Sequence, residues 1–200
     1  MEEKKKLSLT YCFLRRIGLN YSEEEYGQVS IWQVIKKVYT TYRNAFLGRF
    51  FWNSWLLAPL EPRKLRPWVL KKYGCHVGKD VFIGDNVRVD GGHADLIYID
   101  DHAHIAGGTR LLCHQRDLSN YCVGDDYAKL GYVLKPIHLC KGSLVGMESF
   151  VMPGVTIGEG AIVGAGSLVT KDVPAWTIAT GRPAKVVKQI PERKPEIEQQ

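Results

Sequence analysis

The sequence predicts an all-β solenoid, because much of the second half of the chain repeats with a period of six residues. From residue 139 the blocks read LCKGSL, VGMESF, VMPGVT, IGEGAI, VGAGSL and VTKDVP, and each opens on an aliphatic residue. A helix does not have this period, whereas short strands joined by tight turns do. Three such blocks close a triangular coil, and successive coils stack about 4.8 Å apart.

The same period is present earlier in the chain. The blocks VGKDVF, IGDNVR and VDGGHA begin at residue 77, and IDDHAH and IAGGTR begin at residue 99. Between these two runs the tetrapeptide DLIY shifts the register, and between Leu111 and Leu139 the repeat is lost. A stacked coil accepts an insertion only as an excursion from a corner, so we expect residues 113–135 to form an external loop.

The region before the coil, residues 1–74, is predicted to be helical and rich in aromatic residues. Ser30 and Gln33 form a capping-box pattern. Apolar residues then recur at helical spacing: Ile31, Val34, Ile35, Val38, Tyr42, Ala45 and Phe46. Three prolines precede a second short helix over residues 68–73. We expect this region to cap the first coil, whose edge would otherwise be unpaired. The solenoid then covers residues 75–181, and a basic segment and tail cover 182–200.

Composition narrows the functional classes. The formal net charge is +6, but the basic residues are dispersed. A charge of this size suits any anionic partner: a phosphorylated cofactor, a nucleotide sugar, an acidic membrane surface or RNA. Of these, we do not expect nucleic acid. Five cysteines without CxxC spacing indicate neither a zinc site nor a disulfide framework, so we expect no metal ion. The start of the chain does not resemble a signal peptide, and the apolar window 50–60 is too short to span a bilayer. We expect a cytoplasmic protein that can contact the inner membrane face through its N-terminal region.

Two segments carry a resemblance to a known family. VMPGVTIGEGAIVGAGSLVTKDVPAWTIATGRPAKVVKQI resembles the hexapeptide-repeat acyltransferases, and GGHADLIYIDDHAHIAGGTRLLCHQRD resembles their maltose, galactoside and colanic-acid O-acetyltransferase members. The resemblance covers about residues 73–190. It implies a left-handed parallel β-helix, acetyl-CoA as co-substrate, and a homotrimer with active sites between neighbouring subunits.

The resemblance also implies the catalytic residues. His114, at the start of the expected loop, matches the family's general base. Such a base is needed because a sugar hydroxyl is a poor nucleophile, and histidine has an ordinary pKa of about 6.5, close to the working pH. We expect Asp117 to orient the imidazole, and Asp90 and His93 to contact the acceptor. The role of His138 stays open.

The expected acetyl-CoA site follows the later coils. The resemblance places backbone donors for the thioester oxygen at Gly146 and Met147. It also gives residues that line the pantetheine arm and cations for the phosphates: Ala165, Thr170, Lys171, Arg182, Lys185 and Lys188. Many members of the family carry a tryptophan where this chain has Leu144, and a small polar residue where it has Met147.

Four functions fit these observations. The first is an O-acetyltransferase acting on a free, nucleotide-linked or lipid-linked sugar in the synthesis of a surface polysaccharide or glycoconjugate. The second transfers acetyl to an amine of an amino-sugar nucleotide or a xenobiotic. The third is a metal enzyme of the γ-carbonic-anhydrase kind, and the fourth is a non-catalytic scaffold. The ending TKDVPAWTIATGRPAKVV is typical of the transferases and argues against the third function. The context of His114 mildly favours a hydroxyl over an amine, so the first function is our hypothesis.

Overall fold

The computed structural model describes residues 7–19, 23–52 and 60–193. Most of the apolar window at 50–60 and the end of the predicted tail, 194–200, lie outside these residues. The chain divides into two compact units, Met1–Leu47 and Gly48–Gln200. Within the described ranges, no helix combines the length and the apolar character needed to cross a membrane.

Helices make up the described part of the first unit. They are α1 (Leu9–Arg16), α2 (Glu23–Tyr26) and most of α3 (Ile31–Phe51). The predicted capping box is confirmed: the N–H of Ser30 donates to Gln33 Oε1 at 2.7 Å, and the N–H of Gln33 donates to Ser30 Oγ at 3.2 Å. The predicted apolar face of α3 is largely exposed, however. Among the described residues of this helix, Leu47 is the one that is buried.

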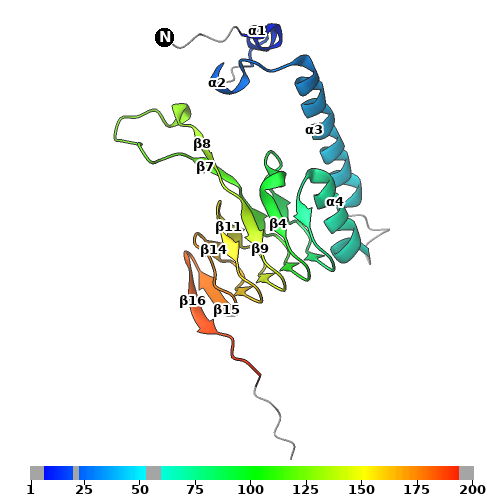
Figure 1. Ribbon diagram of the computed structural model, residues 1–200, viewed down its shortest axis with the longest axis vertical. Helices are drawn as coiled ribbons and strands as arrows, with labels where there is room; N and C mark the ends of the chain where they lie inside the picture. Colours follow the sequence, from blue (N-terminus) through cyan, green and yellow to red (C-terminus); the bar gives the residue numbers. More distant parts are fainter. Residues whose placement is uncertain (1–6, 20–22, 53–59, 194–200) are drawn as a thin grey trace, which may run out of the picture. The chain divides into compact units, whose positions relative to one another are not determined.

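Helix α4 (Arg66–Tyr73) covers the first coil of the second unit (Figure 1). It begins two residues before the predicted boundary and ends at Tyr73, and the φ of 117° at the capping residue Gly74 suits a glycine. Val69 and Leu70 are fully buried at the first strands of the coil, β1 (His76–Val77) and β2 (Phe82–Ile83). Helix α4 therefore packs on the first coil, whereas none of residues 31–46 of α3 is buried.

Three parallel sheets form the sides of the β-helix, and the chain visits them in turn. Their strand orders are β1-β4-β9-β12, β2-β5-β10-β13-β15 and β3-β6-β11-β14. The strands not yet given are β3 (Arg88–Val89), β4 (Ile97–Ile99), β5 (His104–Ile105), β6 (Arg110–Leu111), β9 (Ile137–Leu139), β10 (Leu144–Val145), β11 (Phe150–Val151), β12 (Thr156–Ile157), β13 (Ile162–Val163), β14 (Leu168–Val169) and β15 (Thr177–Gly181). A last strand, β16 (Ala184–Gln189), pairs with β15 in the antiparallel sense.

The aliphatic residues that open the predicted blocks stack to form the core of the coil. Leu139 pairs with Ile99 on one neighbouring coil and with Ile157 on the other, and all three are buried. The next position needs a glycine where coils approach closely. A Cβ on Gly158 would lie 2.4 Å from the backbone nitrogen of Ala175. Where a glycine follows the core residue, as at Gly158, it lets the next coil pack closely.

Residues 113–135 leave the coil as a two-stranded arm rather than as an irregular loop (Figure 1). Strands β7 (His114–Arg116) and β8 (Tyr132–Leu134) pair in the antiparallel sense, and a short 3-10 turn (Tyr127–Lys129) lies near the far end. The guanidinium of Arg116 lies 4.1 Å from the ring centre of Tyr132, a cation–π contact that joins the two strands. This arm begins at His114.

Candidate active site

The register of the third sheet brings Asp90 and His114 together. Val89 of β3 pairs with Leu111 of β6, so the residues that follow these strands lie at the same edge of the sheet. Asp90 follows β3 directly, and His114 begins β7 three residues after Leu111. Twenty-four positions apart in sequence, the two side chains meet at the base of the arm.

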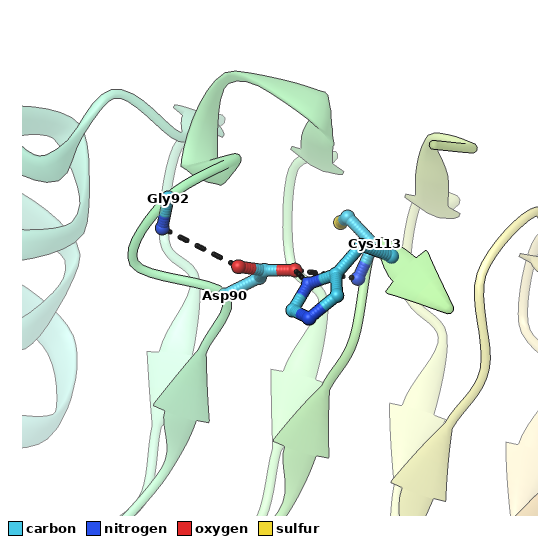
Figure 2. Close-up of polar contacts among 4 residues, drawn as sticks. Asp90, Gly92 and Cys113 are labelled. Atoms are coloured by element: carbon cyan, nitrogen blue, oxygen red, sulfur yellow. Dashed lines mark hydrogen bonds and ion pairs between the residues drawn. The ribbon is translucent and has the colours of Figure 1, made fainter. Parts of the chain in front are cut away.

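The carboxylate of Asp90 is buried and is held by three contacts (Figure 2). Its Oδ2 accepts a hydrogen bond from the N–H of Cys113 at 3.2 Å and contacts Nδ1 of His114. Its Oδ1 accepts from the N–H of Gly92 at 3.3 Å. An ionised carboxylate only accepts, so Nδ1 of His114 carries the proton in this contact. In the neutral ring, Nε2 is then left as a proton acceptor.

Aromatic side chains flank the imidazole of His114 while leaving it accessible. Its ring centre lies 5.7 Å from that of His93 and 5.4 Å from that of Tyr132. The side chain of His114 remains 40% exposed. An oriented imidazole with an accessible nitrogen can accept a proton from a bound hydroxyl or amine, which is general-base chemistry.

In this structure Asp117 bonds within its own turn rather than to the imidazole of His114, which it was expected to orient. Its carboxylate accepts hydrogen bonds from the N–H of Ser119 at 3.0 Å and from the Ser119 hydroxyl at 2.6 Å. These bonds hold the pKa of the Asp117 carboxyl below its usual range. The carboxylate thus bonds to the backbone two residues further on, a contact that aspartate often makes in turns. Asp90, expected to contact the acceptor, is the residue that contacts the imidazole.

Cys113 adjoins the pair but is unsuited to carry an acyl group. Its side chain is fully buried. Burial, followed by the carboxylates of Asp90 and Asp95, raises the pKa of its thiol to about 12. The thiolate is the nucleophilic form of cysteine, so Cys113 is unreactive near neutral pH.

We expect thiol labelling to reflect this difference. In the folded protein at neutral pH, iodoacetamide should modify Cys122, which is exposed, and spare Cys113. Peptide mass spectrometry checks the two sites, with the unfolded protein as the control in which both react. Labelling of native Cys113 at the rate of Cys122 would contradict the assignment of a buried, protonated thiol.

The residues expected to bind acetyl-CoA lie on the coils beyond the Asp90–His114 pair. Leu111, Val151 and Val169 are aligned across β6, β11 and β14. Thr170 therefore lies two strand spacings from Leu112, roughly 10 Å, along one edge of the sheet. Gly146 and Ala165 are stacked on neighbouring coils, since a Cβ on Gly146 would lie 2.5 Å from the nitrogen of Ala165. Met147, next to Gly146, is 57% exposed.

The expected cations lie at the C-terminal end of the coil. Lys171 follows Thr170, and Lys185 and Lys188 are on β16, opposite Thr180 and Ile178 of β15. The guanidinium of Arg182 lies 5.8 Å from the ring centre of Phe150. Lys171 thus follows β14, and the other three cations lie on or just before β16.

Among the described residues, two groups of three side chains could each hold a metal ion, because in each group three donor atoms lie within 4.8 Å of one another. One group is Asp90, His93 and His114, at the candidate active site itself. The other is Asp100, His138 and Cys140, on a different sheet. His138, whose role the sequence left open, is bonded through Nε2 to Asp100 Oδ2 at 3.0 Å.

Comparison with known proteins identifies the repeat. Residues 136–171 match the family model described as bacterial transferase hexapeptide, six repeats. A Staphylococcus aureus (strain Mu50) protein, named provisionally as an acetyltransferase, is 39% identical over 121 residues, which are 59% of this chain and 57% of that protein. The galactoside O-acetyltransferase of Escherichia coli K12 is 31% identical over 129 residues, 63% of this chain and 62% of the enzyme.

The fold has solved counterparts. A hexapeptide-repeat acetyltransferase of Vibrio cholerae O1 biovar eltor, solved with acetyl-CoA, superposes with a TM-score of 0.61 at 20% identity and covers 86% of this chain and all of that one. Together with the family model, this match supports the expected left-handed coil. The chain spans less than two thirds of the two curated relatives' length. The expected relationship is confirmed: the chain carries the hexapeptide repeats of the bacterial transferases, and its relatives and structural neighbours include acetyltransferases.

Proposed function

We propose that the protein is an acetyl-CoA-dependent O-acetyltransferase that acts on a hydroxyl of a sugar. The observation that carries this proposal is the contact between Asp90 and His114 at the base of the β7–β8 arm. It supplies a buried carboxylate and an oriented, partly exposed imidazole at one position. The galactoside relative supports a sugar hydroxyl as the acceptor.

The proposed reaction is a direct transfer. Nε2 of His114 accepts the proton of the acceptor hydroxyl as its oxygen bonds to the thioester carbonyl carbon of acetyl-CoA. The carbon–sulfur bond breaks, and the leaving thiolate of coenzyme A takes the proton back from the imidazolium. Asp90 stabilises the imidazolium by its charge and keeps the ring in the required tautomer. Protonated Cys113 takes no part, so the proposed route forms no acyl-enzyme on this thiol.

The acetyl-CoA site is proposed to extend from the edge near Thr170 toward the cations. Ala165 and Thr170 would line the pantetheine arm, and Lys171, Arg182, Lys185 and Lys188 would bind the phosphates. The backbone N–H groups near Gly146 and Met147 would donate to the developing oxyanion from a neighbouring subunit of a homotrimer. The coenzyme bound to the Vibrio cholerae structural neighbour supports this ligand.

The acceptor is proposed to bind on the arm side of His114. His93 and Tyr132 flank the imidazole and would contact a sugar bound there. A free, nucleotide-linked or lipid-linked saccharide of surface-polysaccharide or glycoconjugate synthesis would present its hydroxyl to Nε2 from this side.

The test is release of free coenzyme A thiol by the purified protein with a panel of sugars, nucleotide sugars, oligosaccharides and amines. We expect release only when a hydroxyl acceptor is present, and mass spectrometry of the product should show an added O-acetyl group. A preference for amines would replace the O-transfer proposal with N-transfer. Failure to bind acetyl-CoA, measured by calorimetry and by the melting temperature, would contradict the transferase proposal itself.

A further inference from the structure

The second donor cluster lies where two coils meet on the first sheet. Ile99 of β4 pairs with Leu139 of β9, so Asp100 and Cys140 follow their strands at equivalent positions of neighbouring coils. The N–H of Asp100 donates to the carbonyl of Leu139 at 2.9 Å, which fixes the spacing of the two coils at this point. His138 lies on β9 opposite Tyr98. Backbone pairing thus holds three side chains of different chemistry at one corner.

We propose that Asp100, His138 and Cys140 form a binding site for a divalent transition-metal ion of the zinc kind. His138 Nε2 lies 3.0 Å from Asp100 Oδ2. One donor atom from each of Asp100, His138 and Cys140 lies within 4.8 Å of the other two. Ligand atoms around one tetrahedral zinc ion need separations of this order, because each lies about 2.0 to 2.3 Å from the metal. One imidazole, one thiolate and one carboxylate suit zinc or cobalt, whereas calcium and magnesium prefer oxygen ligands alone.

The cluster is open enough for an ion to enter. The side chains of His138 and Asp100 are 44% and 45% exposed, and Cys140 is partly exposed. A groove of ≈ 530 Å³ borders the cluster and is lined by His76, Val77, Tyr98, Asp100, Asp101 and Lys141, among others. Three protein ligands leave a fourth tetrahedral position for water or for a ligand atom that arrives through this groove.

The chemistry of the three side chains also suits a metal ion. A bound metal ion stabilises a cysteine thiolate in place of the proton. The existing bond between His138 and Asp100 also orients both side chains without a metal.

The site would act on the fold rather than on acetyl transfer. Asp100 precedes the arm in sequence, and His138 and Cys140 follow it, so a shared ion would join the two coils between which residues 113–135 are inserted. None of the three side chains contacts the Asp90–His114 pair in the described hydrogen bonds and ring contacts. The ion would therefore stabilise the closure of the coil across a long insertion.

The test uses Co²⁺ as the probe, added to the full chain after dialysis against a chelator. We expect one equivalent to bind with a sulfur-to-cobalt charge-transfer band and tetrahedral d–d bands, and Zn²⁺ to displace it. Zn²⁺ should also raise the melting temperature. Cys140→Ser should abolish the charge-transfer band, and His138→Gln should weaken Co²⁺ binding at least tenfold, by analogy with the 10- to 100-fold losses seen for weaker, outer-shell changes.

Matched variants make the result specific. Cys122→Ser removes a cysteine of the arm, and His93→Gln removes a histidine of the other donor group, so both should retain the cobalt spectrum. Circular dichroism and melting in chelator should show that every variant is folded; where Cys140→Ser fails this check, His138→Gln and Asp100→Asn decide. The proposal is overturned if the wild-type chain binds no Co²⁺, if the sulfur band survives in folded Cys140→Ser, or if His93→Gln abolishes binding.

Discussion

His114→Ala is expected to lower kcat/KM for acetyl transfer by a factor of about 10² to 10⁴, the usual contribution of a positioned general base. The physical reason is the loss of Nε2, the atom proposed to take the acceptor's proton, while the coils that would bind acetyl-CoA remain intact. Binding of acetyl-CoA should therefore stay within about threefold of the wild type, a difference of under 1 kcal/mol. Steady-state thiol release measures the rate, and calorimetry measures the binding.

The carboxylate of Asp90 provides a matched pair of variants. Asp90→Asn keeps the size of the side chain but removes the charge that stabilises the imidazolium, and it turns one of the two oxygen acceptors into an NH2 donor. We therefore expect a loss of about 10²-fold or more. Asp117→Asn makes the same chemical change three residues after His114, where the carboxylate bonds only to Ser119 among the described hydrogen bonds. It should leave kcat/KM nearly unchanged.

The assignment of these roles fails if the pair behaves in the opposite way. A large loss in Asp117→Asn with an active Asp90→Asn would mean that the arm rearranges in the working enzyme and that Asp117 orients the base. A fully active His114→Ala would remove the general base from the mechanism. Loss of acetyl-CoA binding in His114→Ala would show that the substitution disturbs the site rather than the chemistry.

Leu139→Ala is expected to lower the free energy of unfolding by about 2 to 5 kcal/mol, as large-to-small substitutions in cores do. Leu139 is fully buried in the first coil after the arm and stacks between Ile99 and Ile157. Truncation leaves a cavity that the neighbouring coils fill poorly, because backbone hydrogen bonds hold them at the strand spacing. Urea denaturation followed by circular dichroism measures the change.

The same substitution on the arm is the control. Leu118→Ala alters a side chain that is 55% exposed, so the change in unfolding free energy should stay within about 0.5 kcal/mol. Equal losses in the two variants would contradict the distinction between the coil as the core and residues 113–135 as an excursion. If urea gives two unfolding transitions, the comparison applies to the transition of the unit that contains the coil.

The chain's local pattern was enough to predict its architecture. The six-residue period identified the core residues of the coil, such as Leu139 and Ile157, because each block repeats the same local contacts. Loss of that period located the excursion at residues 113–135, and the capping box located the start of α3. The position of His114 at the base of the arm followed from the repeat together with the family resemblance.

Contacts between coils were decided by the tertiary structure. Sequence proximity favoured Asp117 as the partner of His114, but the pairing of β3 with β6 presents Asp90 to the imidazole across 24 positions. Similarly, Asp100 and His138, 38 positions apart, are joined by the pairing of β4 with β9 across the arm. A six-residue period specifies which residues face inward. It does not specify the register in which the coil after an insertion pairs with the coil before it, because backbone pairing between distant strands sets that alignment.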